Sequence, residues 1–475
     1  MSRTQAILWT LVAYQLAMVA IGVIAQRLAK DDSDYFLGGR SLGPVVAALS
    51  ASASSSSVWT LIGVSGFAYG FGLAAIWLLP ACVGGFALNW FVLAPALRRV
   101  AREQGAITVT ELLAGPPGSE RRRAVITVAS LIILLSLLTY VAAQFQGAGK
   151  AFADTFDMRF EWALLLGGGI VVLYTMLGGF WAVSLTDTLQ GLMMVVAAIL
   201  LPVAALYELG PAGILASLDS DGQGLWAAAT KGLPGAAAIG FVLGLLGIGL
   251  GYPGQPHVVN RFMALRDERG VVVGRRISLS WAVLIYAGMI VLGWSVRALA
   301  PDLASREDAF LRGTELLLSP VLAGIMVAAL LSAIMSTADS QLLVAASTIS
   351  HDLLGDAGAA QLDPRAQLRR SRATVLAVST GALLVALWVD ETIFSSVLFA
   401  WTAMGSAFGP LLLVTVWRGR PRAWAVLAAM LAGFALSVAA HLWSVTNGGV
   451  FERVLPFVVA LALAYAGTDR RPGPR

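Results

Sequence analysis

Acidic and hydroxyl side chains gather in one stretch of the chain that is otherwise apolar. Residues 332–340 read SAIMSTADS, and Asp339 is the only formal charge between positions 316 and 350. Four polar residues of this stretch follow the i, i+4, i+7, i+8 spacing that places side chains on one face of a helix. They are Ser332, Ser336, Asp339 and Ser340. Oxygen atoms are the ligands of hard cations, so the pattern favours a site for an ion such as Na⁺. The alternative is that these hydroxyls only join packed membrane helices.

A second carboxylate, Asp187, lies in another apolar stretch. Among the 27 Asp and Glu residues, only Asp187 and Asp339 fall clearly inside such stretches. A charged side chain at membrane depth costs about 2.5–3.5 kcal/mol and marks ion or substrate pathways. We therefore expect the two carboxylates either to hold a cation or to include one that exchanges a proton. The alternative is a pair of buried carboxylates that only stabilise the helix bundle.

The elements that position these residues are membrane-spanning helices. Of 475 residues, 58% are hydrophobic and 12% charged, against about 25% charged in soluble proteins. Apolar runs of about 20 residues recur, each long enough to cross a bilayer, and lipid requires them to be helical. The sequence predicts an all-α polytopic membrane protein with 13 spans. They are 6–26, 43–70, 74–97, 124–149, 161–180, 183–207, 234–258, 277–298, 316–349, 373–389, 393–417, 423–443 and 451–468.

The basic residues predict the orientation of these spans. With the N-terminus outside and the C-terminus in the cytoplasm, inward segments hold 24 of the 32 Lys and Arg residues, Arg261 among them, as the positive-inside rule requires. The net charge of +5 therefore needs no nucleic-acid partner. The phosphate-binding pattern GxxxxGK[ST] is absent, which favours an ion gradient over ATP as the energy source.

Two predicted spans contain residues that interrupt helices. Between positions 50 and 60 the second span holds six serines and a threonine, and serine competes with the helix for backbone hydrogen bonds, so we expect a break near Ala53–Ser57. The seventh span carries Pro253 and Pro256 among several glycines, which also predicts a break. Two interrupted spans in corresponding positions are typical of the binding site of transporters with inverted repeats.

The spacing of the two breaks predicts the domain organisation. We expect a single transmembrane domain over 1–475, with a first inner loop at 27–42, repeat one at about 43–207, repeat two at about 234–417 and two final helices at 423–468. Trp59 and Trp401 are interpreted as residues of the membrane interface or of general packing.

Five motifs resemble the sodium/solute symporter family, and within it the sodium/proline symporters most. They are YFLGGRSLGPVVAALSASAS (35–54), LGGFWAVSLTDTLQ (177–190), GYPGQPHVVNRFMAL (251–265), SAIMSTADSQLLVAAS (332–347) and AWTAMGSAFGPLLL (400–413). The resemblance runs from about residue 30 to residue 420. It implies the inverted five-helix repeats first seen in a bacterial leucine transporter.

The resemblance also implies three sets of site residues. The main Na⁺ site would use the carbonyl groups of Ala53, Ser56 and Ala333 and the hydroxyls of Ser336 and Thr337. A second cation site would use Asp187, Ser336, Asp339 and Ser340. The substrate site would use Ser57, Val58, Tyr140, Ile248, Tyr252, Gln255 and Pro256.

Four positions depart from the pattern of the family. Proline symporters usually carry Asp, Gly and Trp where this chain has Ser55, Val58 and Ile248, and relatives often carry a hydroxyl where it has Asp339. We expect Val58 to make the substrate pocket smaller.

The predicted function is Na⁺-coupled import of a small organic solute by alternating access in a bacterial cytoplasmic membrane. The resemblance favours proline or another amino acid, with a carboxylate or vitamin as an alternative substrate, and implies no organic cofactor and no obligatory protein partner beyond the bilayer. Another alternative is a nutrient receptor that signals through a separate partner. Three scattered histidines argue against an intramembrane enzyme.

Overall fold

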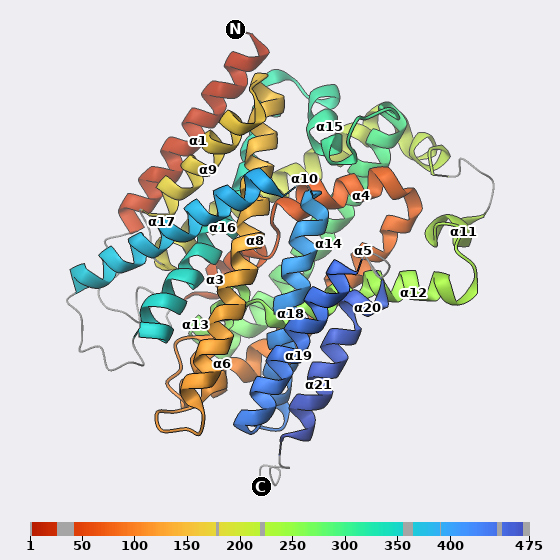
Figure 1. The fold of residues 1–475 in the computed structure, drawn as a ribbon. Coiled ribbons are helices and arrows are strands. Elements are labelled where there is room, and N and C mark those ends of the chain that lie inside the picture. Colours follow the sequence, from red (N-terminus) through yellow and green to blue (C-terminus); the bar gives the residue numbers. More distant parts are fainter. Residues whose placement is uncertain are drawn as a thin grey trace.

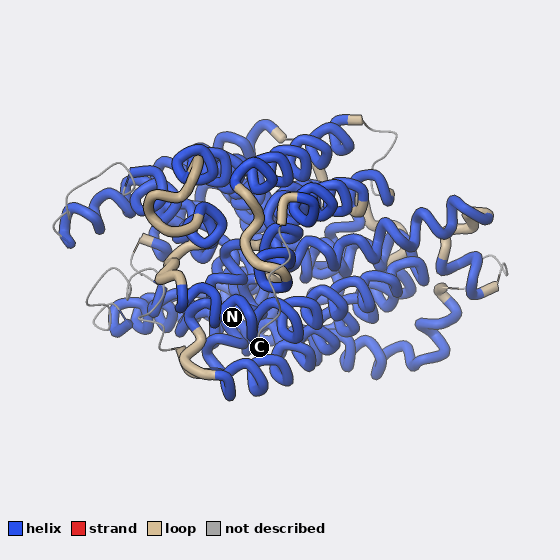
Figure 2. The backbone as a smooth tube through the Cα atoms, turned by 90° about the horizontal axis from the view of Figure 1, so that it is seen from below, coloured by secondary structure: helices blue, strands red, loops and turns tan. Residues whose placement is uncertain are grey.

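The computed structural model describes residues 2–25, 42–176, 180–218, 224–354, 364–389, 391–443 and 449–468. Within these ranges the chain is helical almost throughout and contains no β-strand (Figure 2). The inner loop predicted for 27–42 lies outside the described residues, apart from Leu42.

Most of the predicted spans are long helices. They are α1 (Arg3–Ala25), α8 (Arg122–Phe156), α9 (Phe160–Thr175), α10 (Phe180–Ala216), α14 (Glu268–Leu299), α16 (Pro320–Ser347), α17 (Pro364–Trp388), α18 (Ile393–Trp417), α19 (Ala423–Leu442) and α21 (Leu455–Ala466). Within the described part of the chain, ten helical stretches are long and apolar enough to cross a membrane. The total of 13 spans stays a prediction.

Shorter elements join these helices. The predicted third span consists of η4 (Gly72–Trp77), α5 (Leu78–Ala87), η5 (Leu88–Leu93) and α6 (Ala94–Glu103). The remaining connecting elements are α7 (Val109–Ala114), α11 (Leu225–Ala229), η7 (Arg306–Asp308), α15 (Ala309–Leu317), η8 (Thr348–Leu353) and α20 (Val450–Arg453).

Both predicted helix interruptions are present. In the second span, α3 (Pro44–Ser54) ends before residues 55–57, and the chain resumes as the π-helix η3 (Trp59–Gly63) and then α4 (Val64–Phe71). In the seventh span, α12 (Gly235–Leu246) passes into the 3₁₀-helix η6 (Gly247–Gly254). Gln255 is extended, with φ −96° and ψ 101°, and α13 (Pro256–Ala264) follows. Serine, glycine and proline thus produce the breaks where the sequence predicts them.

Helix α16 lies at the centre of the bundle, against α1, α8, α10 and α17 (Figure 1). Its residues from Met326 to Ser347 are all buried, as expected for a helix that is apolar around its whole circumference. The end of α3 packs against α16, α10, α13 and α14, while η6 packs against α5 and α18. The two broken spans therefore sit inside the bundle, where no lipid reaches their free backbone groups.

Glycines allow the second broken span to approach α18 closely. A Cβ on Gly254 would lie 2.6 Å from the Cα of Gly405, so the two backbones are in direct contact. Small residues at membrane helix interfaces permit such contacts. This packing holds η6 and its neighbouring break against α18.

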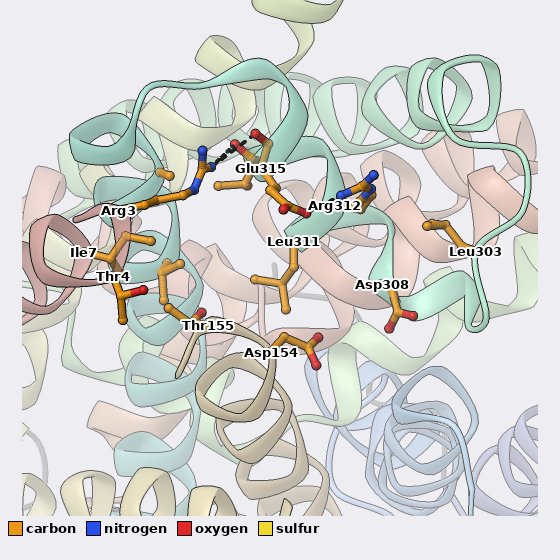
Figure 3. A pocket seen from close by; sticks show the side chains of 13 residues that line it. Arg3, Thr4, Ile7, Asp154, Thr155, Leu303, Asp308, Leu311, Arg312 and Glu315 are labelled. Carbon is orange, nitrogen blue, oxygen red and sulfur yellow. Dashed lines mark hydrogen bonds and ion pairs between the residues drawn. The ribbon is translucent and has the colours of Figure 1, made fainter. Parts of the chain in front are cut away.

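The two ends of the chain lie at opposite ends of the molecule (Figure 1). Two open cavities have volumes of about 350 and 540 Å³ and share Asp154 in their walls, and the first of them lies beside the start of α1. Figure 3 shows the first of them, with Arg3 hydrogen-bonded to the Glu315 carbonyl at its rim. Lys150 lines the second cavity and forms an ion pair with Asp308, which lines the first.

Candidate functional site

Backbone carbonyls at the end of α3 face hydroxyl groups of α16. The Ser336 hydroxyl lies 3.3 Å from the Ala53 carbonyl oxygen and 3.2 Å from that of Ala333. The Thr337 hydroxyl donates to the carbonyl of Ser54 at 3.2 Å. All five residues are fully buried. The structure thus brings together four of the five residues predicted for the main Na⁺ site and adds the Ser54 carbonyl.

The fifth predicted residue, Ser56, lies in the break itself. Its N–H donates to the Ala53 carbonyl at 3.0 Å, and its hydroxyl accepts from the indole N–H of Trp281 at 3.1 Å. Trp281 belongs to α14, so a neighbouring helix holds the break in place. Ser56 therefore contacts the group of carbonyl and hydroxyl oxygens through its hydrogen bond to Ala53.

This cluster has the chemistry that a Na⁺ ion requires. Its possible ligands are all oxygen atoms, and the two hydroxyl groups donate to carbonyl oxygens. A cation replaces such hydrogen bonds when the hydroxyls rotate. Every oxygen in the cluster is neutral, so any negative charge that balances the ion must come from nearby.

The predicted second cation site contains a positive side chain. Asp187 Oδ2 accepts from the hydroxyls of Ser50 at 2.6 Å and Ser54 at 3.1 Å, and from Arg261 Nη2 at 3.1 Å. The Asp187 side chain is 0% exposed and the Arg261 side chain 1%. Arg261 Nη2 also donates to Ser340 Oγ at 2.5 Å. Two of the four predicted residues thus already contact a guanidinium.

The position of Arg261 corrects the sequence analysis, which counted it among the basic residues of the inward segments. It is buried inside the bundle, where α13 packs against α3, α6 and α16 and the Arg261 side chain reaches Asp187 of α10. Its Nε donates to Ser50 Oγ at 3.1 Å, and its Nη1 donates to the His257 carbonyl of its own helix. The signal available in the sequence was its place six residues after the break at Gln255.

Asp339 is held much more weakly than Asp187. Its Oδ1 accepts from Ser340 Oγ at 3.5 Å, and its Oδ2 has no hydrogen-bond partner within the described ranges. The side chain is nonetheless fully buried. Asp339 is thus a buried carboxylate with an oxygen left without a donor.

A small enclosed cavity lies between the two helix breaks. Its walls are Ser55, Trp59, Tyr140, Ile248, Tyr252, Tyr286, Val397, Leu398 and Trp401. Its volume is about 10 Å³, close to the 10–15 Å³ or so that one water molecule needs. Three residues predicted for the substrate site, Tyr140, Ile248 and Tyr252, line this cavity.

The other residues predicted for the substrate site lie around this cavity and are not among its walls. The Ser57 hydroxyl accepts from the Tyr140 hydroxyl at 3.4 Å. The Gln255 amide donates to the carbonyls of Gly251 at 3.0 Å and Trp401 at 2.9 Å, which ties the second break to α18. Pro256 begins α13.

Val58 is not among the walls of this cavity, and its narrowing of the substrate pocket stays a prediction. A Cβ on Gly147 of α8 would lie 2.3 Å from Val58 Cγ2, so the valine side chain fills the space above that glycine. Residue spacing does not predict the orientation of a side chain that follows a helix break.

Aromatic side chains form most of the cavity, including the two tryptophans that were interpreted as interface or packing residues. Trp401 lies with its ring centroid 4.7 Å from that of Tyr252, and its indole N–H donates to the Ile248 carbonyl at 3.1 Å. The Trp59 indole N–H is buried and has no partner in the described part of the chain. Trp59 and Trp401 therefore line the cavity, a position that hydropathy alone did not distinguish from that of other tryptophans.

The comparison with protein families identifies this architecture. The profile of the sodium:solute symporter family matches residues 35–433. The chain belongs to this family. An osmoregulated proline transporter of Bacillus subtilis (strain 168) is 34% identical over 458 residues, covering 94% of this chain and 91% of that protein. A sodium/proline symporter of Escherichia coli (strain K12) is 35% identical over 442 residues, covering 91% and 87%.

Solved structures agree with the fold. A Na⁺-coupled sialic acid symporter in a substrate-bound outward-open state superposes with a TM-score of 0.80 over 98% of this chain and 99% of that one, at 17% identity. A transporter of the nucleobase-cation-symport-1 family in a closed conformation gives 0.55 over 92% and 94%, at 14% identity. The chain thus has the leucine-transporter-type fold that the sequence predicts.

Membership of the symporter family answers the broader functional questions. The protein is a multi-pass membrane transporter and not an enzyme, and Na⁺ is its coupling ion. Its solute is a small molecule bound within the membrane.

Proposed function

We propose that this protein imports proline, or another small amino acid of similar size, together with Na⁺ across a bacterial cytoplasmic membrane. The observation that carries the proposal is the position of the enclosed cavity. It touches the first helix break through Ser55 and the second through Ile248 and Tyr252, beside the hydroxyl and carbonyl cluster of α3 and α16. The two relatives above, named as proline transporters, support this choice of substrate.

The walls of the cavity suit a small amphoteric solute with an apolar ring. Trp59, Tyr252 and Trp401 offer ring faces and edges for apolar contact. The unpartnered indole N–H of Trp59 is a donor for the substrate carboxylate. Peptide groups freed at the breaks supply further partners for the charged ends.

Coupling follows from the shared use of the first break. Ala53 and Ser54 supply carbonyls to the proposed main Na⁺ site, and Ser55 lines the cavity directly after them. Na⁺ bound at Ala53, Ser56, Ala333, Ser336 and Thr337 would order this segment and so favour the conformation that binds the solute. Such coupling is reciprocal, so the solute also favours Na⁺ binding.

Transport requires the bundle to open, because the cavity of about 10 Å³ is smaller than any amino acid. We infer that the N-terminus lies outside, so that the two open cavities that share Asp154 face the outer solution. The Lys150–Asp308 ion pair would then lie on the outer route. The inward-facing route would open at the other end of α3.

Uptake by proteoliposomes with an imposed Na⁺ gradient tests the proposal. A panel of proline, other amino acids, carboxylates and vitamins is presented, and we expect accumulation of proline or a similar amino acid that stops when Na⁺ is replaced by K⁺. Equal uptake driven by a proton gradient alone would contradict the Na⁺ coupling. Binding of the solute without accumulation would favour the receptor alternative.

A further inference from the structure

We propose that Asp339 is the counter-charge of a single coupling Na⁺ ion, and that the guanidinium of Arg261 takes the place of a second cation. The inference rests on the proposed function and deepens it, because it assigns the number of coupling ions and the residue that balances their charge. On this inference, the Arg261–Asp187 ion pair occupies the predicted second cation site and leaves no room there for Na⁺.

The guanidinium of Arg261 occupies the space beside Asp187. Arg261 Nη2 lies 3.1 Å from Asp187 Oδ2 and 2.5 Å from Ser340 Oγ. A Na⁺ ion bound by these same two oxygens would touch the guanidinium. Since like charges in contact repel strongly inside a protein, Arg261 excludes the ion and neutralises Asp187 itself.

Among the described residues, the negative charge of Asp339 is left without a compensating partner. The proposed ligands of the main site are carbonyls and hydroxyls, none of which carries a formal charge. Asp187 is compensated by Arg261, whereas Asp339 Oδ2 has no hydrogen-bond partner in the described part of the chain. A buried carboxylate without a partner is costly. One Na⁺ ion would bring the sum of Asp187, Asp339, Arg261 and the ion to zero.

Hydrogen bonds connect Asp339 to the proposed main Na⁺ site. Asp339 lies two residues after Thr337 on α16, and its neighbour Ser340 is hydrogen-bonded to the Ser54 hydroxyl at 2.9 Å. The Ser54 carbonyl in turn accepts from Thr337 at 3.2 Å. Ser340 and Ser54 thus link the Asp339 carboxylate to the proposed ligands of the main site through hydrogen bonds. Asp187 and Arg261 are the charged groups that interact most with Asp339, and the titratable side chains of Tyr14 in α1 and Tyr174 in α9 also face it.

Equilibrium binding of radioactive Na⁺ to the purified full-length protein tests the inference without transport. We expect one Na⁺ ion per native chain, and a Kd about tenfold higher or more in Asp339→Asn, as the loss of a nearby charge in a buried site implies. Ser347→Ala, which removes a buried hydroxyl bonded within α16, is the matched control and should keep the native Kd. Adding Ser55→Asp to Asp339→Asn should return the Kd for Na⁺ toward the native value, because it restores a carboxylate beside the proposed main site.

Arg261→Gln tests the other half of the inference. Without the guanidinium, Asp187 and Ser340 become free to bind a cation, so this variant should bind two Na⁺ ions per chain. Two ions per native chain, or an unchanged Kd in Asp339→Asn, would overturn the inference, as would a folded Arg261→Gln that binds one. If Asp339→Asn does not fold, Asp339→Ser replaces it, because a small hydroxyl keeps a polar group at this position without the charge. A protein that binds no Na⁺ at all would instead contradict the proposed function.

Discussion

The guanidinium of Arg261 lies 3.1 Å from the carboxylate of Asp187, with both side chains buried. Arg261 belongs to α13, which follows the second helix break, and Asp187 belongs to α10 of the predicted first repeat. The ion pair therefore ties the two halves of the transporter together beside the proposed Na⁺ site. Ser50 of α3 and Ser340 of α16 complete its hydrogen bonds.

Removing Arg261 should destabilise the protein strongly. Arg261→Met leaves Asp187 buried without its partner, and breaking one side of a buried pair costs about 3–5 kcal/mol. The measurement is thermal unfolding of the purified protein in detergent. Arg261→Met combined with Asp187→Leu should recover much of the loss, because Asp187 no longer leaves a buried charge without its partner. A single variant that unfolds at the native temperature would contradict the role of the pair.

Replacing Thr337 should weaken the use of Na⁺. Thr337→Ala removes a hydroxyl that faces the Ser54 carbonyl, and losing one ligand oxygen should raise the Na⁺ concentration for half-maximal uptake about tenfold. Thr175→Ala is the control, since its hydroxyl bonds only to the Val171 carbonyl of its own helix. Equal Na⁺ dependence of the two variants in proteoliposomes would show that Thr337 is not a ligand.

Trp59 should act on the solute and not on the ion. Trp59→Phe keeps an aromatic wall but removes the indole N–H that has no partner in the described structure. We expect the KM for the transported amino acid to rise about tenfold, the worth of one hydrogen bond to a charged group, with little change in the Na⁺ dependence. Trp417→Phe, at an 84% exposed position, should leave both unchanged. An unaltered KM in Trp59→Phe would remove this donor from the site.

Gly147 should tolerate no side chain while Val58 is present. Gly147→Ala places a Cβ 2.3 Å from Val58 Cγ2, and overpacking of this kind costs about 1–3 kcal/mol. Val58→Gly should relieve the clash in the double variant, which thermal unfolding would detect. Gly169→Ala in α9 is the matched control, because nothing lies within 4 Å of its added Cβ. A Gly147→Ala variant as stable as the control would place Val58 elsewhere.

Local chemistry made much of the fold predictable from the sequence. The breaks at Ser55–Ser57 and Gln255 follow from serine, glycine and proline, which act on their own backbone. Predicting that Ser336 and Thr337 face the first break also needed the family resemblance. Helical spacing shows which residues share one face of a helix, but not which helix packs against that face.

The tertiary structure alone decided where the side chains after each break point. Arg261 was counted as an inward loop residue because it follows the predicted span 234–258, where basic residues are expected on the cytoplasmic side. It is buried because α13 packs against α3 and α16, where Asp187 of α10 offers a compensating charge. Trp59 and Trp401 are ordinary tryptophans in hydropathy, and only the approach of η3, η6 and α18 makes them walls of one cavity.

The sequence by itself determined that this is a helical membrane protein with two interrupted spans and a row of hydroxyl and carboxyl side chains on α16, because hydropathy and backbone propensity act within a few residues. The tertiary structure decided which charges meet. Pairing between Arg261 and Asp187 joins residues 74 positions apart, and such a contact depends on the packing of whole helices, not on any local pattern of residues.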